Sequence, residues 1–281
     1  MHTGFFTDTT LCIGCKACEV ACKQWNELPS DGFTFTGHSY DNTVELSGTT
    51  WRHVAFIEQM SADEGGRQDR WLMSSDVCKH CTNAGCLEAC QTGAIIRNEF
   101  GSVYIQPDVC NGCGYCVVSC PFGVVDVIEK FDPSGTRYNL ASLNEERREE
   151  KKTALQNNGG VAGKCTLCYD RQNLGFVPAC AKACPTESIQ FGVVDELRER
   201  AKQRVETLQQ RGVHASLYGA DDAGGGIGPL NAFFLLTDKP EVYNLPSEPV
   251  LPSTRQPAGY TAAALAAVGL AVAGWIMFKN A

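Results

Sequence analysis

Cysteine is the residue whose spacing stands out in this chain of 281 residues. All sixteen cysteines fall into four groups of four, separated by stretches that contain none. The third group, Cys110-Asn-Gly-Cys113-Gly-Tyr-Cys116-Val-Val-Ser-Cys120, is followed directly by a proline, Pro121. Thiolate sulfur is a soft ligand that binds zinc and iron, so cysteines spaced this closely indicate metal binding.

The spacing of the third group, with two, two and three residues between its cysteines, is typical of bacterial ferredoxins. In that pattern three thiolates bind one 4Fe–4S cluster and the fourth reaches across to a second cluster. One such run therefore implies another. The remaining groups are Cys12 to Cys22, with the same spacing, Cys78 to Cys90, with four residues in its middle gap, and Cys165 to Cys184, with eleven.

Applied to all four groups, this crossing rule predicts four 4Fe–4S clusters. The second and third groups are close in sequence and form one pair, and the first and fourth groups close around them. Because every position is a cysteine, each cluster is expected to be 4Fe–4S rather than 3Fe–4S. The first predicted set of ligands is Cys12, Cys15, Cys18 and Cys184; the second is Cys22, Cys165, Cys168 and Cys180; the third is Cys78, Cys81, Cys86 and Cys120; the fourth is Cys90, Cys110, Cys113 and Cys116.

Disulfide bonds and structural zinc are the alternatives for so many cysteines. Disulfide frameworks suit short secreted domains, whereas this chain is long and no apolar signal segment follows its first residues. A structural zinc ion needs four ligands around one ion, and the cysteine spacings in these groups bring the wrong number of ligands together for that. Histidine replaces cysteine in Rieske centres, but all four cysteines are present around His80, so a supporting or surface role is expected for it.

The composition excludes nucleic acid as a partner. The formal net charge is −8, and each oxidised cluster with four thiolates adds about −2. Nucleic-acid binding needs clustered cationic residues instead. No nucleotide loop, nucleophile with its base, or open metal site is present, so no catalytic residue is expected. An electron carrier is predicted, and a scaffold whose clusters only hold the fold is the alternative of a different class.

The elements around the cysteines predict an α+β fold of two ferredoxin-like modules, each with two 4Fe–4S clusters, plus one C-terminal transmembrane helix. We name them the outer module (residues 1–30 with 160–194) and the inner module (residues 75–130). Inserted loops and strands are expected at 31–74 and 131–159, a helix and an extended tail at 195–258, and the transmembrane helix at 259–279.

Local patterns place several elements within this plan. A strand is expected from Trp51 to Glu58, with His53 as an ordinary strand histidine, and a β-hairpin turns near Asn98 to Gly101. Asp195 is expected to cap a helix whose apolar positions recur at helical spacing. After that helix one apolar strand is expected, Ala232-Phe-Phe-Leu-Leu, and the rest of the tail is expected to run over a partner or over the chain itself.

The last segment predicts a membrane span. No charged residue occurs from Gln256 to Phe278, and Gly259 to Phe278 is long enough to cross a bilayer. Its small residues suit close helix–helix contact, and Trp275 with Lys279 suits a membrane interface. A buried helix of a soluble protein is the alternative.

Several of these motifs together resemble the iron–sulfur (beta) subunit of membrane-bound respiratory formate dehydrogenases. They are the opening Cys-Ile-Gly-Cys-Lys-Ala-Cys-Glu-Val-Ala-Cys, the following Lys23-Gln-Trp-Asn, the tail segment Asp238-Lys-Pro-Glu-Val-Tyr-Asn-Leu-Pro and the C-terminal span. The likeness covers nearly the whole chain. The cysteine groups alone are shared with electron-transfer subunits of many molybdopterin oxidoreductases, and the Lys23 and tail motifs point to formate.

The resemblance implies a non-catalytic electron-transfer subunit of anaerobic respiration. A molybdenum or tungsten molybdopterin subunit would oxidise formate, and electrons would enter at the first set. They would leave from the fourth set toward an integral membrane subunit, with cytochrome b or without haem, and the quinone pool. The same relay in a hydrogenase or a polysulfide or thiosulfate reductase is the near alternative.

The resemblance also implies a place at the inner membrane, with a single C-terminal span. The bulk of the chain would then face the periplasm, exported with a signal carried by the catalytic subunit. A complex that faces the cytoplasm is the alternative. Lys279 beyond the span favours the periplasmic orientation.

Overall fold

The computed structural model of the chain describes residues 1–30, 35–37, 40–60, 69–128 and 160–279. The strands are β1 (Thr3–Asp8), β2 (Arg52–Gln59), β3 (Arg70–Val77), β4 (Ile95–Arg97), β5 (Val103–Ile105), β6 (Asp126–Ile128), β7 (Val161–Gly163), β8 (Ile189–Val193), β9 (Ser216–Tyr218) and β10 (Ala232–Leu236). The α-helices are α1 (Ala17–Trp25), α2 (Gly85–Glu88), α3 (Tyr115–Val118), α5 (Tyr169–Asn173), α6 (Ala179–Ala183), α7 (Val194–Gln210) and α8 (Gln256–Lys279). Short 3-10 helices are η1 (Thr9–Leu11), η3 (Pro240–Tyr243) and η4 (Pro252–Arg255).

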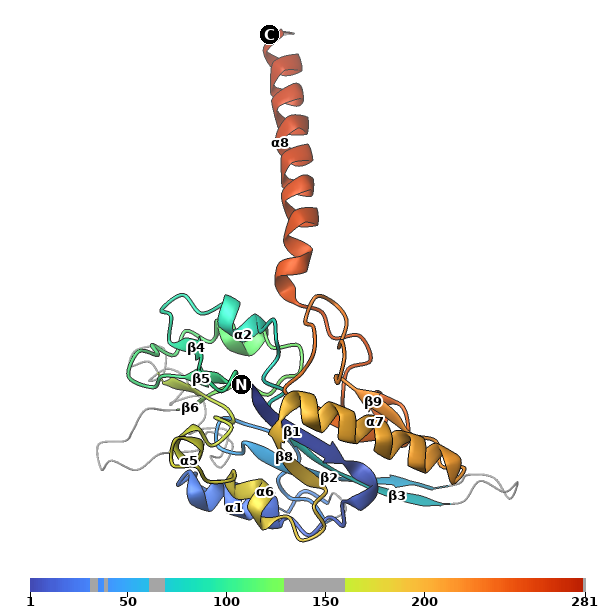
Figure 1. Cartoon of the computed structure of the whole chain (residues 1–281). Helices are drawn as coiled ribbons and strands as arrows, with labels where there is room; N and C mark the ends of the chain where they lie inside the picture. The colour runs from blue at the N-terminus through green and yellow to red at the C-terminus, as the bar shows by residue number, and fades with distance from the viewer. Residues whose placement is uncertain (31–34, 38–39, 61–68, 129–159, 280–281) are drawn as a thin grey trace.

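Strand β1 lies inside the largest sheet, whose strand order is β8-β1-β10-β9. It pairs antiparallel with β8 and parallel with β10, and β9 pairs antiparallel with β10. The two ends of the globular part of the chain therefore lie side by side in one sheet (Figure 1).

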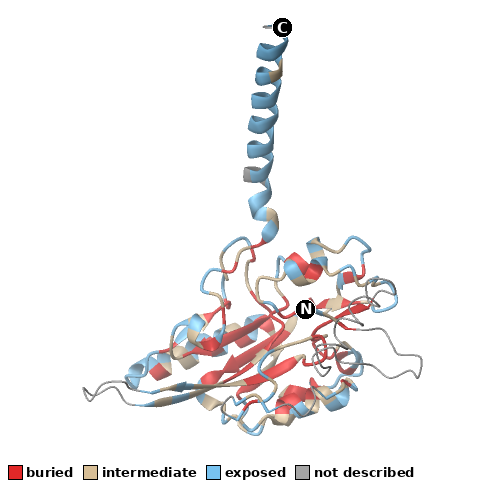
Figure 2. Ribbon diagram, turned by 180° about the vertical axis from the view of Figure 1, so that it is seen from behind, coloured by how far each residue is buried: buried red, intermediate tan, exposed pale blue. Residues whose placement is uncertain are grey.

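Alternate side chains of β1 enter two different cores. Phe5 is fully buried among the cysteines, whereas Phe6 is fully buried against α7 and β10. Because successive strand residues point to opposite faces, β1 separates a core that contains buried cysteines from one whose buried residues are aliphatic and aromatic. Leu197 and Ala201 of α7 cover the second core. Figure 2 shows these buried strands in the middle of the globular part.

Three two-stranded ladders accompany the large sheet: β2 with β3, β4 with β5, and β6 with β7. The predicted turn near Asn98 is confirmed, since the Gly101 N–H donates to the Asn98 carbonyl between β4 and β5. The strand predicted from Trp51 begins at Arg52. His53 on this strand is an ordinary, satisfied histidine, because its Nε2 lies 2.6 Å from Oδ2 of Asp41.

The apolar strand expected after α7, Ala232-Phe-Phe-Leu-Leu, is confirmed as β10. β10 is buried at all its positions and lies between β1 and β9. A continuous apolar run of this kind suits a strand that is covered on both faces. The segment therefore runs over the chain itself and completes its sheet.

Asp195 does not cap α7, contrary to the sequence expectation. The N-cap is Val193, one position before the helix, and it makes no side-chain cap bond. Asp195 lies in the first turn instead, where its carboxylate interacts favourably with the helix dipole and accepts a hydrogen bond from Arg198 at 2.9 Å. Strand β8 runs directly into the helix, which leaves no loop for a capping residue.

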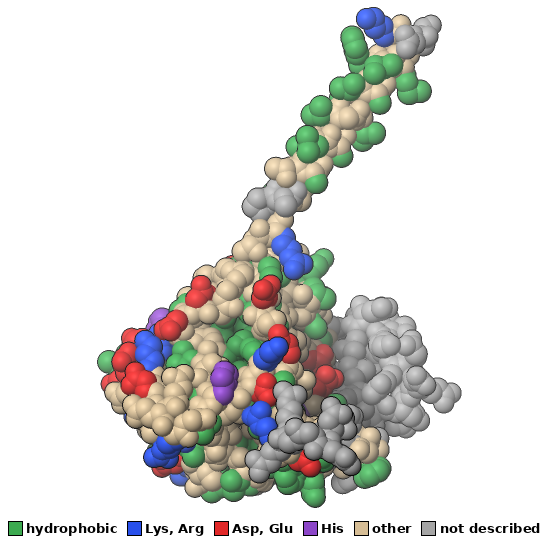
Figure 3. All heavy atoms as spheres, turned by 90° about the vertical axis from the view of Figure 1, so that its right-hand side faces the viewer, with side chains coloured by type: hydrophobic (Ala, Val, Ile, Leu, Met, Phe, Trp, Pro, Cys, Tyr) green, Lys and Arg blue, Asp and Glu red, His purple; other side chains and the backbone are tan. Residues whose placement is uncertain are grey.

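Helix α8 stands apart from the globular part and is long and apolar enough to cross a membrane. Its apolar residues are exposed on all sides: Leu265 is 74%, Val268 61% and Leu270 75% exposed. Figure 3 shows hydrophobic side chains along its length and charged ones gathered on the globular part. The alternative of a helix buried in the core of this chain is wrong for α8.

The predicted module boundaries are only partly visible. The insertion expected at 31–74 includes β2 and most of β3, whereas the one expected at 131–159 lies outside the described residues. Strand β7 falls in the range assigned to the outer module but pairs with β6 of the inner module. The division into two modules stays a prediction.

Candidate iron–sulfur centres

Each cysteine group runs into or lies on a short helix. Helix α1 carries Cys18 and Cys22, α2 carries Cys86, α3 carries Cys116, and α6 carries Cys180. The loops before these helices bring further cysteines to the same places. The thiols are therefore held on, or in loops next to, hydrogen-bonded helical backbone.

Glycine is required at two tight turns within these loops. Gly14 has a φ of +67°, and a Cβ there would lie 2.6 Å from the ring of Phe56. Gly112 has a φ of +73°, and a Cβ there would lie 2.3 Å from the carbonyl oxygen of Gly160. Both positions combine a left-handed conformation with contact that no larger residue fits.

The cysteines of the first set line one small cavity. Its walls include Cys12, Cys15, Cys18 and Cys184, with Ser75 and Ile189 beside them. Burial raises the pKa of Cys12, a backbone hydrogen bond from Gly14 opposes this, and the charges of Cys184 and Cys15 raise it further. These four thiols are therefore close neighbours.

The thiols of the second set are all buried. Burial raises the pKa of Cys22 well above its usual value, and the charges of Cys180, Cys165 and Cys168 add to the effect. Segments distant in sequence meet here, because α1 packs against α6.

The third and fourth sets lie in the inner module. Burial raises the pKa of Cys81, followed by the charges of Cys78, Cys120 and Cys86. Burial likewise raises the pKa of Cys116 to about 11, and the charges of Cys110, Cys113 and Cys90 contribute. Cys113 is exposed, as is Cys15 of the first set.

Thiols of consecutive sets also act on one another. Burial and thiols of the same set raise the pKa of Cys18, of Cys165 and of Cys86, and a thiol of the next set raises each of them further. The charge of Cys180 acts in this way on Cys18, that of Cys78 on Cys165, and that of Cys116 on Cys86. These three pairs link first to second, second to third and third to fourth sets.

The donor arrangement fits 4Fe–4S clusters better than single metal ions. Within the described residues, no three His, Cys, Asp or Glu side chains come close enough to hold one ion. A 4Fe–4S cluster binds each thiolate at a different iron, so its ligands surround a larger volume. The raised thiol pKa values mean that binding must release protons, as is usual for metal sites.

Several sulfur atoms receive hydrogen bonds from the protein. The backbone N–H of Ala162 donates to Sγ of Cys110 at 3.3 Å, and that of Leu167 to Sγ of Cys165 at 3.3 Å. Ser75 Oγ lies 3.3 Å from Sγ of Cys18. Donors of this kind tune the reduction potential of a bound cluster.

Two side chains near the thiols, Arg52 and Lys164, were not singled out by the sequence, and a third, His80, was expected in a supporting or surface role. Arg52 and Lys164 are buried with 1% and 2% exposure, although both occupy positions that read as ordinary polar residues. His80 is fully buried and accepts a hydrogen bond from the Val103 N–H, so the surface role considered for it is wrong. A lysine directly before Cys165 was the one available signal.

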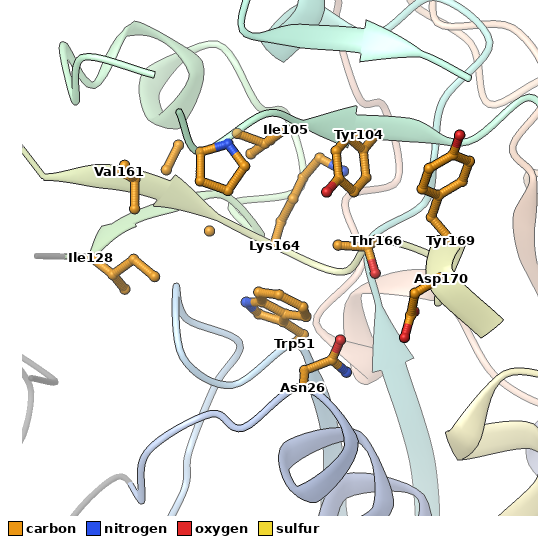
Figure 4. Close-up of a pocket in the computed structure, with 13 residues that line it drawn as sticks. Asn26, Trp51, Tyr104, Ile105, Ile128, Val161, Lys164, Thr166, Tyr169 and Asp170 are labelled. Atoms are coloured by element: carbon orange, nitrogen blue, oxygen red, sulfur yellow. The ribbon is translucent and has the colours of Figure 1, made fainter. Parts of the chain in front are cut away.

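A cavity of about 260 Å³ is lined in part by Lys164, and no cysteine lines it. Figure 4 shows Trp51, Tyr104 and Lys164 among its walls, with Lys164 reaching from the end of β7 toward the strand that carries Tyr104. The cavity is therefore separate from the thiol sets, and Lys164 lies between the two.

Two family models match the chain, and both are described as 4Fe-4S dicluster domains. One covers residues 69–133 and 150–194, and the other covers residues 11–94. Together with the cysteine arrangement, they define an α+β protein with ferredoxin-like 4Fe–4S dicluster domains. The predicted fold class is confirmed.

Individual relatives narrow this class. The formate dehydrogenase iron-sulfur subunit of Haemophilus influenzae is 39% identical over 86% of this chain and 68% of its own length. The nitrate-inducible formate dehydrogenase iron-sulfur subunit of Escherichia coli is 38% identical over 86% of this chain and 71% of its own length. The B subunit of the anaerobic dimethyl sulfoxide reductase of E. coli is 32% identical over 70% of this chain and 76% of its own length. This chain belongs to the family of formate dehydrogenase iron–sulfur subunits, which confirms the resemblance.

Proposed function

We propose that this chain carries electrons through four 4Fe–4S clusters, from a subunit that oxidises formate to a membrane subunit that reduces quinone. Such clusters, when bound, accept and release single electrons. The chain's own contribution is to hold them with the four sets of thiolates and to shield them from water. No residue of this chain is assigned a catalytic role.

The electrostatic interaction between thiols of consecutive sets carries this proposal. Cys18 and Cys180, Cys165 and Cys78, and Cys86 and Cys116 each join one set to the next. The four sets thus follow one another in the order that a relay needs. A structural role alone would not require sixteen ligands in a continuous series.

The position of α8 supports an exit near the inner module. Helix η4, which leads into α8, packs against α2, where Pro252 approaches Gly85. Helices α1 and α6 lie at the far side of the globular part (Figure 1). Electrons that enter at the first set and leave from the fourth would therefore move toward the base of α8.

The partners follow from this path. A molybdopterin subunit with molybdenum or tungsten would dock near the first set, and an integral membrane subunit, a cytochrome b or a haem-free protein, near the fourth. In this proposal α8 crosses the inner membrane and the globular part faces the periplasm. Lys279 at the far end of α8 would then lie on the inner side, in agreement with the positive-inside rule.

Iron analysis tests the cluster count. A fully loaded chain should contain about sixteen iron atoms. A well-loaded sample with about eight or fewer would exclude four clusters.

Replacement of Cys116 by Ser tests the direction of the path. The fourth set then lacks one thiolate, so quinone reduction by the purified complex should be lost, while formate oxidation with an artificial dye continues. Lys202→Gln, on the exposed side of α7, is the control and should retain both activities. Equal loss of both activities in Cys116→Ser would contradict the proposed exit.

The likeness to the B subunit of dimethyl sulfoxide reductase favours a second candidate, the same relay in another molybdenum complex. Copurification of the catalytic subunit, followed by assays of formate oxidation and dimethyl sulfoxide reduction, separates the two. A complex that oxidises no formate would exclude the first candidate.

A further inference from the structure

Three cationic side chains with 2% exposure or less lie among the described residues: Arg52, Lys79 and Lys164. A buried charge is costly unless it is compensated. Lys79 is compensated, because its ammonium group forms an ion pair with Asp76. Within the same described residues, neither Arg52 nor Lys164 has a carboxylate at ion-pair distance. Their charges need another partner.

Arg52 lies between the first and second sets. Burial lowers the pKa of its guanidinium, but the charges of nearby thiolates raise it beyond that; these are Cys180, Cys18, Cys165 and Cys22. Cys18 belongs to the first set and the other three to the second. One face of the guanidinium lies over the Phe5 ring, with its Cζ 4.8 Å from the ring centroid.

Only part of the Arg52 guanidinium is used in hydrogen bonds to the protein, and the rest could face the clusters. Its Nη1 donates to Oγ of Ser75 at 3.1 Å, and that hydroxyl lies 3.3 Å from Sγ of Cys18. Its Nε and Nη2 are buried and have no hydrogen-bond partner among the described residues. Unpaired buried donors beside thiolates are well placed to face bound clusters.

Lys164 lies between the second and third sets. Burial lowers the pKa of its ammonium group, whereas the charges of Cys78, Cys86, Cys165 and Cys120 raise it. Cys165 belongs to the second set and the other three to the third. Its Nζ donates to the carbonyl oxygens of Val103 and Cys165, which fixes the ammonium group in place.

We propose that Arg52 and Lys164 are fixed positive charges at the first two junctions of the series, each raising the reduction potentials of the clusters on both sides. Reduction adds negative charge, and a nearby buried cation stabilises the reduced form. None of the three most buried cations, Arg52, Lys79 and Lys164, takes this position beside the fourth cluster. The inference rests on the four proposed ligand sets.

Redox titration of the purified complex, followed by electron paramagnetic resonance, tests this placement. Each signal is first assigned with a ligand variant of one set. Lys164→Gln should shift the midpoints of the second and third clusters to more negative values and leave the first and fourth unchanged. Arg52→Gln should shift the first and second in the same direction and leave the third and fourth unchanged.

The controls separate charge from structure. Lys164→Arg and Arg52→Lys keep the charge and should retain most of the wild-type midpoints, and Lys202→Gln should change none. If a neutral variant loses iron, loss confined to the two adjacent clusters supports the placement, and equal loss from all four contradicts it. If the wild type gives four signals and none of them shifts in either neutral variant, the proposal for Arg52 and Lys164 is wrong but the four ligand sets stand. If a fully loaded wild type gives fewer than four signals, the four proposed ligand sets are wrong as well.

Discussion

The residue ranges predicted as the outer and inner modules each contain one cysteine group with the 2-2-3 spacing and one with a longer middle gap, but they differ in what surrounds the cysteines. In the outer module, β1 and β8 belong to a four-stranded sheet, and α1 has nine residues. In the inner module, β4 and β5 have three residues each, and α2 and α3 have four. The outer module is thus anchored in a large conventional core, whereas the inner one has little regular structure of its own.

Exposure of the thiols follows the same difference. Five of the eight thiols of the first and second sets are buried, against three of the eight of the third and fourth sets, and each pair of sets has one exposed thiol. Short helices and strands are not stable by themselves in water. The inner module therefore depends more on its metal ligands, and the outer module more on apolar packing.

Removal of iron should have the largest effect and should reveal this difference. In the metal-free chain, burial and the charges of neighbouring thiols raise the pKa of Cys116 to about 11, so that its thiol stays neutral at pH 7. The neutral thiols do not replace the lost metal–sulfur bonds. Because folding and metal binding are coupled, the region that depends most on those bonds should lose its structure first. Hydrogen exchange followed by mass spectrometry should show early loss of protection in residues 75–128 and lasting protection in β1 and β10. Equal loss in both regions would remove the distinction.

Phe233→Ala should have the next largest effect, confined to the second core. Phe233 is fully buried and stacks on Phe6, with ring centroids 5.5 Å apart. The cavity should lower the free energy of unfolding by about 3–5 kcal/mol. Chemical unfolding followed by far-ultraviolet circular dichroism measures this change.

Ile95→Val is a milder core substitution in the inner module, at a position with 5% exposure. It should cost about 0.5–1.5 kcal/mol. The visible absorbance of the clusters should stay at its wild-type intensity in both variants under native conditions. Loss of inner-module clusters in Phe233→Ala would show that the two cores are not independent.

Sequence patterns predicted the local elements and the cysteine groups well. The hairpin at Asn98, the strand that begins at Arg52 and the apolar face of α7 depend on nearby residues, and periodicity alone indicates them. The membrane-length helix follows from composition in the same way.

Contacts distant in sequence were not predictable. The parallel pairing of β10 with β1 joins the two ends of the globular part, and no local pattern indicates which strands meet. The burial of Arg52 was hidden for the same reason. On its strand it reads as the polar member of an alternating pattern, and the thiolates around it come from α1, α6 and the fourth cysteine group. The candidate ligands were therefore visible in the sequence, but the charges between them were not.

The turn before the third cysteine of a group gives the finest comparison between the modules. Lys16 in the outer module has a φ of 56°, and Gly114 in the inner module has a φ of 77° at the equivalent position. Glycine adopts this left-handed conformation freely, whereas a lysine needs support. Asp41 supplies it, since its Oδ1 accepts a hydrogen bond from Lys16 Nζ at 2.8 Å and its Oδ2 lies 2.6 Å from His53 Nε2.

Asp41→Asn should therefore cost about 1 kcal/mol of stability, an effect comparable to that of Ile95→Val, and any change in cluster signals should be limited to the first set. Burial favours the neutral carboxyl, but the bonds with Lys16 and His53 outweigh it and lower the pKa of Asp41. A lowered folded pKa means that this stabilisation is complete above the unfolded value of about 3.9 and is lost as the pH falls through the folded value. The cost of Asp41→Asn should thus be fully present above about pH 4 and shrink as the pH falls through the folded pKa of Asp41 in unfolding experiments.

Lys16→Gly in the Asp41→Asn background is the matching control. Glycine needs no support in the left-handed turn, so the double variant should recover part of the stability lost in Asp41→Asn. Cluster signals of the fourth set should not change in either variant, because Gly114 already has this freedom. If the double variant is instead less stable than Asp41→Asn, the bond to Lys16 does not act by supporting the turn.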